Sequence, residues 1–180
     1  MSGMNESEGK VEDQGADKKT DAQARVASPT KFIVCVDKND ASQVALRFAC
    51  IKAMKCNGLV EILHIMEPPQ GDALLGVAET MRAEARAAAE VMVQELCREA
   101  NEIAGIMPSI LLREGKVGEE LMKAAMEDPD AKMLVLGVNP GGSKRGRLIA
   151  HLSTQMGEAL LIPVLLVPGN LTDQQIEELS

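Results

Sequence analysis

The chain has 180 residues, of which 46% are hydrophobic and only two are aromatic, Phe32 and Phe48. This length and apolar content suit one globular domain that folds without disulfide or metal staples, and they exclude collagen-like, coiled-coil and disordered chains. The net charge of -8 repels nucleic-acid phosphates, and the lack of Tyr and Trp removes the usual stacking platforms for bases. We therefore expect no nucleic-acid partner.

Residues 1–29 are rich in charged and small polar side chains. Such a segment cannot bury enough apolar surface to offset its ordering entropy, so we predict a disordered tail, with a partner-binding arm as the alternative. The chain shows no apolar secretory signal, its longest apolar stretch is about half of the ~20 residues that span a membrane, and its four cysteines form no C-x-x-C pair. We expect a cytoplasmic protein with reduced thiols and no membrane contact.

Short apolar runs alternate with helical patterns from residue 31 onward. Runs rich in β-branched residues predict buried strands, and apolar residues spaced by three or four predict helices. In chain order the expected elements are a strand at 31–37, a helix at 41–56, a strand at 59–66, one or two helices at about 72–104, a strand at 108–115, a helix at 117–128, a strand at 132–139, a helix at about 145–160, a strand at 163–168 and a short terminal helix. Helix ends are predicted at Asn39 or Asp40, Asn57-Gly58, Gly105, and Thr172 with Gln175.

Strands that are apolar on both faces and alternate with helices predict an α/β domain with one doubly wound parallel sheet, covered by helices on each side. We expect this domain to span residues 30–169, with a short helical tail over 170–180. Ligands of such folds bind beyond the carboxyl ends of the strands, where the strand order reverses. The segments to search are therefore 37–40, 66–70, 113–116 and 137–144.

The sequence contains no Walker A loop and no G-x-G-x-x-G, H-E-x-x-H or G-x-S-x-G motif. Only two histidines are present, His64 and His151, so a multi-histidine metal site is excluded. His64 lies inside a predicted strand between Leu63 and Ile65, which favours a structural role over a catalytic one. We name no catalytic residue.

Asp37 stands at the carboxyl end of the first predicted strand. A carboxylate in this position accepts hydrogen bonds from ribose hydroxyls or approaches a bound magnesium ion. A solvated turn or an Asx-type cap fits the same position. Both interpretations stay open.

The loop GVNPGGSK at residues 137–144 is the strongest local signal for a ligand. Its glycines let backbone amides approach an anion, the predicted helix that follows offers its positive N-terminal end, and Lys144 adds a cation to an otherwise acidic chain. These features suit a polyphosphate. The alternative is a glycine-rich turn followed by a basic, solvated helix face.

Four stretches carry a family resemblance: IVCVDKNDASQVALRFACIKA, LHIMEP, GKVGEELMKAAMEDPDAKMLVLGV and ALLIPVLLVPG. Together they resemble the universal stress protein (UspA-type) domain, from about residue 31 to residue 169 without large gaps. The resemblance implies a Rossmann-like, adenine nucleotide alpha hydrolase-like sheet of five parallel strands in the order 3-2-1-4-5. It also implies a homodimer paired through the fifth strands and, in one branch of the family, ATP bound between the first and fourth strands.

Carried over residue by residue, the resemblance implies a ribose-binding role for Asp37 and an adenine-contacting backbone position at Ile65. It also implies that Gly137, preceded by Leu136, is the first glycine of the phosphate-binding motif. With no aromatic side chain available to stack on adenine, base recognition would use backbone groups and aliphatic walls at Ile65 and Leu136.

The chain departs from the motif G-2x-G-9x-G-[ST] of the ATP-binding branch after its first glycine. Pro140 takes the second glycine position, Ala150 the third, and His151 the hydroxyl position. Pro140 has no amide hydrogen to donate to a phosphate, and Ala150 adds a methyl group. Neighbouring glycines and charge-assisted donors are the possible replacements, although a surface helix position for His151 is equally open. Beyond the strands, the candidate nucleotide-binding residues are Gly141, Gly142, Lys144, His151 and Leu152.

Two hypotheses follow from the resemblance. In the first, the protein is a cytoplasmic stress-response protein that binds ATP or a related adenine nucleotide as a regulatory ligand, with magnesium present only alongside the nucleotide and with slow or no hydrolysis. In the second, it is a dimeric interaction protein of the same fold that binds no nucleotide. A phosphotransferase is disfavoured because the sequence has no Walker lysine. Dimerisation has its own rationale, since the apolar edge strand at 163–168 would invite aggregation if unpaired.

Overall fold

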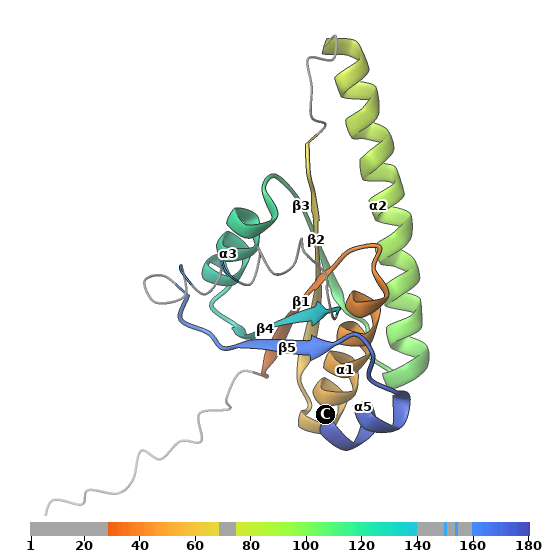
Figure 1. Cartoon of the computed structure of the whole chain (residues 1–180), viewed down its shortest axis with the longest axis vertical. Helices are drawn as coiled ribbons and strands as arrows, with labels where there is room; N and C mark the ends of the chain where they lie inside the picture. Colours follow the sequence, from red (N-terminus) through yellow and green to blue (C-terminus); the bar gives the residue numbers. More distant parts are fainter. Residues whose placement is uncertain (1–28, 69–74, 140–149, 151–153, 155–159) are drawn as a thin grey trace, which may run out of the picture.

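The computed structural model describes residues 29–68, 75–139, 150, 154 and 160–180. Figure 1 shows a central sheet with helices on both faces. The strands are β1 (Lys31–Val36), β2 (Leu59–Met66), β3 (Ser109–Glu114), β4 (Ala131–Val138) and β5 (Val164–Pro168), and the helices are α1 (Asp40–Cys56), α2 (Leu75–Ala104), α3 (Val117–Glu127) and α5 (Asp173–Leu179). All neighbouring strands are parallel, in the order β3-β2-β1-β4-β5, which confirms the predicted fold class.

The helix ends follow the predicted signals. Asn57 ends α1 in the left-handed conformation, with φ 52°, and its N–H donates to the Ala53 carbonyl. Gly105 ends α2 with φ 64°, as expected for the residue that tolerates a positive φ best. Thr172 and Gln175 form both hydrogen bonds of a capping box at the start of α5. The predicted tail over 1–29 and the predicted helix over 145–160 lie almost entirely outside the described residues.

Successive side chains of a strand point to opposite faces of the sheet, and this alternation divides the core into two clusters. Even-numbered residues of β1, beginning with Phe32, pack against α1, α2 and α5, whereas Ile33 packs against α3. Both phenylalanines, Phe32 and Phe48, lie in the larger cluster beneath α1 and α2. The remaining bulk comes from aliphatic side chains, so the scarcity of aromatic residues does not leave either face of the sheet uncovered.

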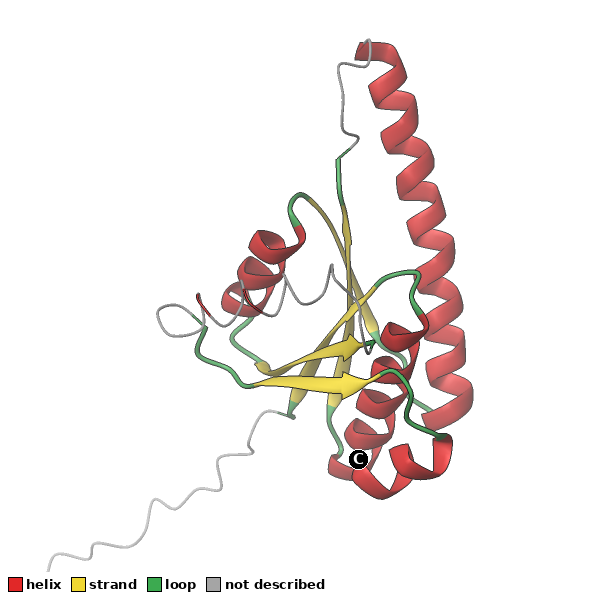
Figure 2. Ribbon diagram, in the orientation of Figure 1, coloured by secondary structure: helices red, strands yellow, loops and turns green. Residues whose placement is uncertain are grey.

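The segment expected as one or two helices is the single helix α2, 30 residues long. Its first half extends beyond the ends of the strands (Figure 2), and between residues 76 and 88 only Ala78 is even partly buried. Its second half carries Val93, Leu96 and Ala100 into the core. In the part of the chain that the structure describes, no helix combines the length and hydropathy of a membrane span.

None of the four cysteines forms a disulfide bond, in agreement with the prediction of reduced thiols. Cys50 is completely buried, and desolvation of its thiolate raises the pKa of the thiol to about 12. Burial also raises the pKa of Cys97. Because a thiolate is the reactive form, these two thiols act as small core side chains and not as nucleophiles.

Candidate functional site

The carboxyl edge of the sheet collects the candidate residues that come from strands. β1 lies between β2 and β4, with Val36 opposite His64 and Cys35 opposite Leu136. This register brings the segment after β1 to the same edge as the ends of β2 and β4. Asp37, Ile65 and Gly137 therefore lie at one edge, at the point where the chain reverses the strand order.

The Asp37 carboxylate accepts two hydrogen bonds from Asn39. Its Oδ1 accepts a hydrogen bond from the Asn39 backbone N–H at 3.0 Å, and its Oδ2 accepts one from the Asn39 Nδ2 at 2.8 Å. The backbone contact is the local Asx-type turn that the sequence left open. The side-chain contact was not foreseen: Asn39 occupies the N-cap position of α1 as predicted, but its side chain makes no capping hydrogen bond.

Ser42 fixes the turn between β1 and α1 from the inside. Its side chain is completely buried. The Oγ lies 2.8 Å from the Asp37 carbonyl oxygen and 2.8 Å from the Asn39 carbonyl oxygen. The hydroxyl has one proton, so it donates to one of these two oxygens at a time. The Ser42 Oγ also accepts the Asp37 N–H at 3.2 Å. Sequence reasoning overlooked Ser42, although a serine three residues after a helix cap is a typical partner for the free backbone groups of the first turn.

Gly137 is explained by packing before any ligand is considered. A Cβ at this position would lie 1.9 Å from the Ala41 carbonyl oxygen and 2.8 Å from the Ser42 nitrogen. A Cβ added to Gly169, just after β5, would likewise lie only 2.5 Å from the Ala41 Cβ. The first turn of α1 thus sits directly on the ends of β4 and β5, which only glycine permits.

The side chains of Ile65 and Leu136 are buried and form no exposed surface at the carboxyl edge of the sheet. Their exposed fractions are 8% and 4%, and both side chains belong to the core cluster beneath α3. A base bound at this edge would therefore meet their backbone groups. The loop candidates Gly141, Gly142, Lys144, His151 and Leu152, and also Pro140, lie outside the described residues, whereas Ala150 is exposed.

His64 has a structural role, as predicted. Its Nδ1 lies 2.9 Å from the Val36 carbonyl oxygen, and because a carbonyl only accepts, this nitrogen is the protonated one. The bond joins the end of β2 to the residue just before Asp37. It therefore supports the position of the site without contributing a free ring nitrogen on that side.

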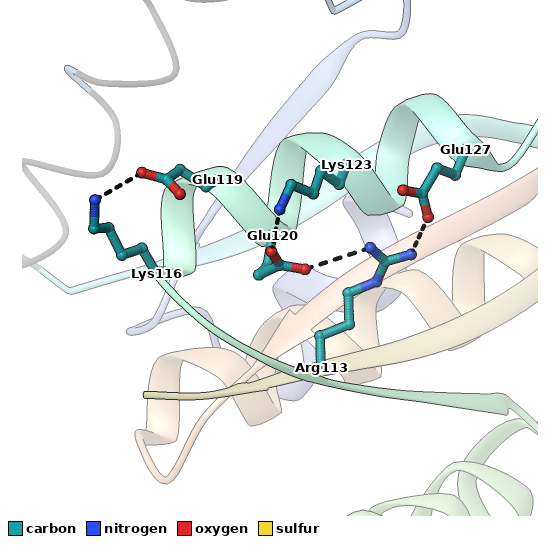
Figure 3. Close-up of polar contacts among 6 residues, drawn as sticks. All are labelled: Arg113, Lys116, Glu119, Glu120, Lys123 and Glu127. Atoms are coloured by element: carbon teal, nitrogen blue, oxygen red, sulfur yellow. Dashed lines mark hydrogen bonds and ion pairs between the residues drawn. The ribbon is translucent and has the colours of Figure 1, made fainter. Parts of the chain in front are cut away.

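A cluster of charged side chains joins β3 to α3 (Figure 3). Arg113 contacts Glu120 at 3.5 Å and Glu127 at 2.5 Å, and Lys123 contacts Glu120 at 2.6 Å. The hydrogen bond from Lys123, reinforced by Arg113, lowers the pKa of Glu120. Positive and negative groups compensate one another within the cluster, so we interpret it as the attachment of α3 to the sheet and not as a ligand site.

A cavity of about 180 Å³ lies on the other face, between α2 and the ends of β2 and β3. Arg82 and Arg86 line it, and each is engaged in an ion pair at 3.0 Å, with Glu114 and Glu90 respectively. Within the described ranges no three His, Cys, Asp or Glu side chains are grouped to hold a metal ion. The edge formed by β1 and β4 is accordingly the candidate site.

Comparison with known proteins agrees with the fold described above. The universal stress protein family matches residues 29–168. Three solved structures share the fold: UspA from Lactobacillus plantarum (16% identity, 78% of this chain and 99% of that chain covered, TM-score 0.65), a universal stress protein from Archaeoglobus fulgidus in complex with dAMP (18%, 78% and 98%, 0.57), and a family protein from Arabidopsis thaliana with AMP bound (17%, 78% and 92%, 0.54).

Comparison with curated protein sequences gives no significant match. The family match covers more than half of the chain, and its boundaries enclose every strand of the sheet. The chain belongs to the universal stress protein family.

Proposed function

We propose that this protein binds an adenine nucleotide, ATP with magnesium in the first instance, as a regulatory ligand with slow or no hydrolysis, in a cytoplasmic stress response. The observation that carries the proposal is the Asp37 carboxylate, which accepts hydrogen bonds from Asn39 at the carboxyl end of β1, the strand paired with β4 and its Gly137. Two proteins of the same fold, from Archaeoglobus fulgidus and Arabidopsis thaliana, hold dAMP and AMP. Their ligands support a nucleotide here.

Each candidate residue has a role in the proposal. Asp37 would accept the ribose hydroxyls, and the backbone at Ile65 and Leu136 would contact the adenine. The glycine-rich loop from Gly137 to Lys144, with His151 and Leu152, would hold the phosphates. Magnesium would arrive with the nucleotide, bound mainly by phosphate oxygens.

Nucleotide binding should appear as thermal stabilisation. At a ligand concentration about 100 times Kd, binding to the folded state alone adds about 2.7 kcal/mol to the free energy of unfolding, which raises Tm by several degrees. We expect this shift with millimolar Mg-ATP, and we expect Asp37→Ala to abolish most of it. Ion-exchange chromatography of the supernatant after denaturing the purified protein tests for nucleotide carried through purification. No shift and no released nucleotide would refute the proposal.

A second candidate function is that of a dimeric interaction protein without a nucleotide. Two observations favour it: Pro140 and Ala150 replace motif glycines, and packing against Ala41 already requires Gly137 without any ligand. The same thermal experiment separates the two functions, because this version predicts no shift at saturating Mg-ATP.

Dimerisation through β5 is part of either function. β5 is the last strand of the sheet, paired on one side with β4, and Leu166 on it is 40% exposed. An unpaired apolar edge invites association, and pairing with the same strand of a second copy covers it. We expect sedimentation to show a dimer at micromolar concentration and Leu166→Lys to weaken it. Val91→Lys, on the exposed side of α2, is the control that should not. A wild-type monomer would contradict the expectation.

A further inference from the structure

We infer that Asn39 is a positioning residue: it holds the Asp37 carboxylate so that both oxygens face the two adjacent hydroxyls of a ribose. The inference rests on the proposed nucleotide function and makes it more specific, because it selects ribonucleotides with free 2′ and 3′ hydroxyls over their 2′-deoxy counterparts.

The hydrogen bonds between the two residues restrict the carboxylate in a particular way. One donor is the Asn39 backbone N–H and the other is its side-chain amide, and they reach different oxygens of Asp37, at 3.0 and 2.8 Å. A single donor would leave the carboxylate plane free to rotate. Two donors on different oxygens define that plane, and both bonds are strengthened by the negative charge of the acceptor.

The backbone that carries both residues is fixed as well. The buried Ser42 hydroxyl contacts the carbonyl oxygens of Asp37 and Asn39. The residue before Ser42, Ala41, packs against the backbone at Gly137. A side chain that positions a binding group works only if its own backbone does not move, and this turn meets that requirement.

Asn39 also departs from the behaviour expected of its place in the helix. An asparagine at an N-cap normally accepts a hydrogen bond from a backbone N–H of the first turn, but the Asn39 side chain makes no such bond and donates to Asp37 instead. Local preferences are overridden most often where a site needs the side chain for something else. The unused cap therefore points to a requirement at Asp37.

The chemistry then identifies the ligand class. A carboxylate oxygen can accept more than one hydrogen bond, so an oxygen held by Asn39 is not thereby saturated. A carboxylate fixed in one plane matches two donors at a fixed spacing, and a ribose with both hydroxyls supplies them. A 2′-deoxyribose supplies only one donor and so makes one hydrogen bond fewer to the carboxylate.

The test is isothermal titration calorimetry of the full chain with Mg-ATP and with Mg-2′-dATP. We expect the wild-type protein to bind ATP about tenfold more tightly than 2′-dATP, the ratio that one hydrogen bond to a charged group supplies. In Asn39→Ala the ATP affinity should fall about tenfold, and the preference for ATP should shrink towards one. Asp40→Asn, the exposed neighbour that starts α1, is the matched control and should keep both values.

A loss of stability should not account for weaker ATP binding in Asn39→Ala, because the Asn39 side chain makes no capping hydrogen bond to α1. The Tm of Asn39→Ala without nucleotide should stay within about 2 °C of wild type, and Asn39→Asp, which keeps a preferred cap residue and removes the amide donor, should lose ATP affinity in the same way. If both variants bind ATP and 2′-dATP as the wild type does, Asn39 has no positioning role and the inference is wrong.

A nucleotide-free measurement separates this inference from the proposed function. The side-chain amide protons of Asn39, observed by NMR in the protein without nucleotide, should shift markedly in Asp37→Ala. If they shift while the wild type binds no nucleotide, the contact is real and the proposed function and its ligand class fail. If they do not shift, Asn39 does not hold Asp37, whatever the protein binds.

Discussion

Replacing Gly137 with alanine should destabilise the protein by about 4 kcal/mol or more, enough to unfold a domain of ordinary stability. The added Cβ would lie 1.9 Å from the Ala41 carbonyl oxygen and 2.3 Å from the Ala41 carbonyl carbon. Both atoms belong to the helix backbone, so no side-chain rotation relieves the overlap, and α1 would have to leave the ends of β4 and β5. Urea unfolding measured by circular dichroism gives the change in the free energy of unfolding.

Gly76→Ala is the matched control for this substitution. Gly76 lies in the exposed first turn of α2, where an added Cβ would meet no atom within 4 Å. Alanine at such a helical position should stabilise the protein by about 0.5–1 kcal/mol. A Gly137→Ala variant as stable as wild type would show that α1 does not pack on β4 as described. The glycine would then be explained by ligand binding alone.

Lys31→Met is expected to cost about 2–3 kcal/mol. The Lys31 Nζ lies 2.9 Å from Glu61 Oε1 and 2.5 Å from Asp128 Oδ2, while Ser109 donates to Glu61 at 3.0 Å. Removal of the cation leaves two carboxylates close together and largely out of water. Breaking a fully buried pair costs ~3–5 kcal/mol, and the lower value here reflects the 12–18% of these side chains that stays exposed.

The loss in Lys31→Met should depend on pH. Desolvation, the largest effect, raises the pKa of Asp128. The hydrogen bond from Lys31, the backbone hydrogen bonds from Asp130 and Ala131 and the charge of Lys31 together outweigh it and hold the pKa below the usual 3.8. This contribution is present above pH 3.8 and is lost as the pH falls through the folded-state pKa. Desolvation lowers the pKa of Lys31, but hydrogen bonds to Asp128 and Glu61 raise it above 10.5. That contribution is present below pH 10.5 and is lost as the pH rises through the folded-state value.

The difference between Lys31→Met and wild type should therefore be greatest between pH 3.8 and 10.5 and should shrink at both extremes. Urea unfolding at several pH values provides the measurement. Lys116→Met removes a cation whose side chain is 81% exposed in its pair with Glu119, and this control should change stability by less than about 1 kcal/mol. Equal effects of the two substitutions would contradict the role assigned to the Lys31 pairs.

The proposed dimer, the proposed ribose contact and the packing at Gly137 involve different residues, so each can be tested by a different substitution. Gly137 tests packing, Asp37 and Asn39 test the ribose contact, and Leu166 tests the edge strand. A protein that fails only at Asp37 would remain a folded, dimeric member of its family without a nucleotide. The experiments thus distinguish the two candidate functions one contact at a time.

Local sequence patterns predict the strands and helices that the structure describes, in their order along the chain, and they predict the edge of the sheet at which a ligand would bind. β2 begins and ends at the predicted residues, and the ends of α1, α2 and α5 carry the predicted signals, because strand alternation, left-handed caps and capping boxes depend on neighbours within a few residues. The position of Asp37 at the end of β1 follows from the same local patterns.

The contacts that hold the residues of the candidate site become visible only in the folded chain. The sequence offered Asn39 as a helix cap, Gly137 as an anion-binding glycine, and Ile65 and Leu136 as walls for a base. Folding instead turns Asn39 towards Asp37, places Ala41 against Gly137, and buries both aliphatic side chains beneath α3. The packing of Ala41 on Gly137 and the burial of Ile65 and Leu136 depend on how closely segments distant in sequence approach each other, and a distance of that kind leaves no periodic or compositional trace in either segment. Asn39 is only two residues from Asp37, but its side chain has two local partners to choose from, the first turn of α1 or the Asp37 carboxylate, and residue type alone does not decide between them.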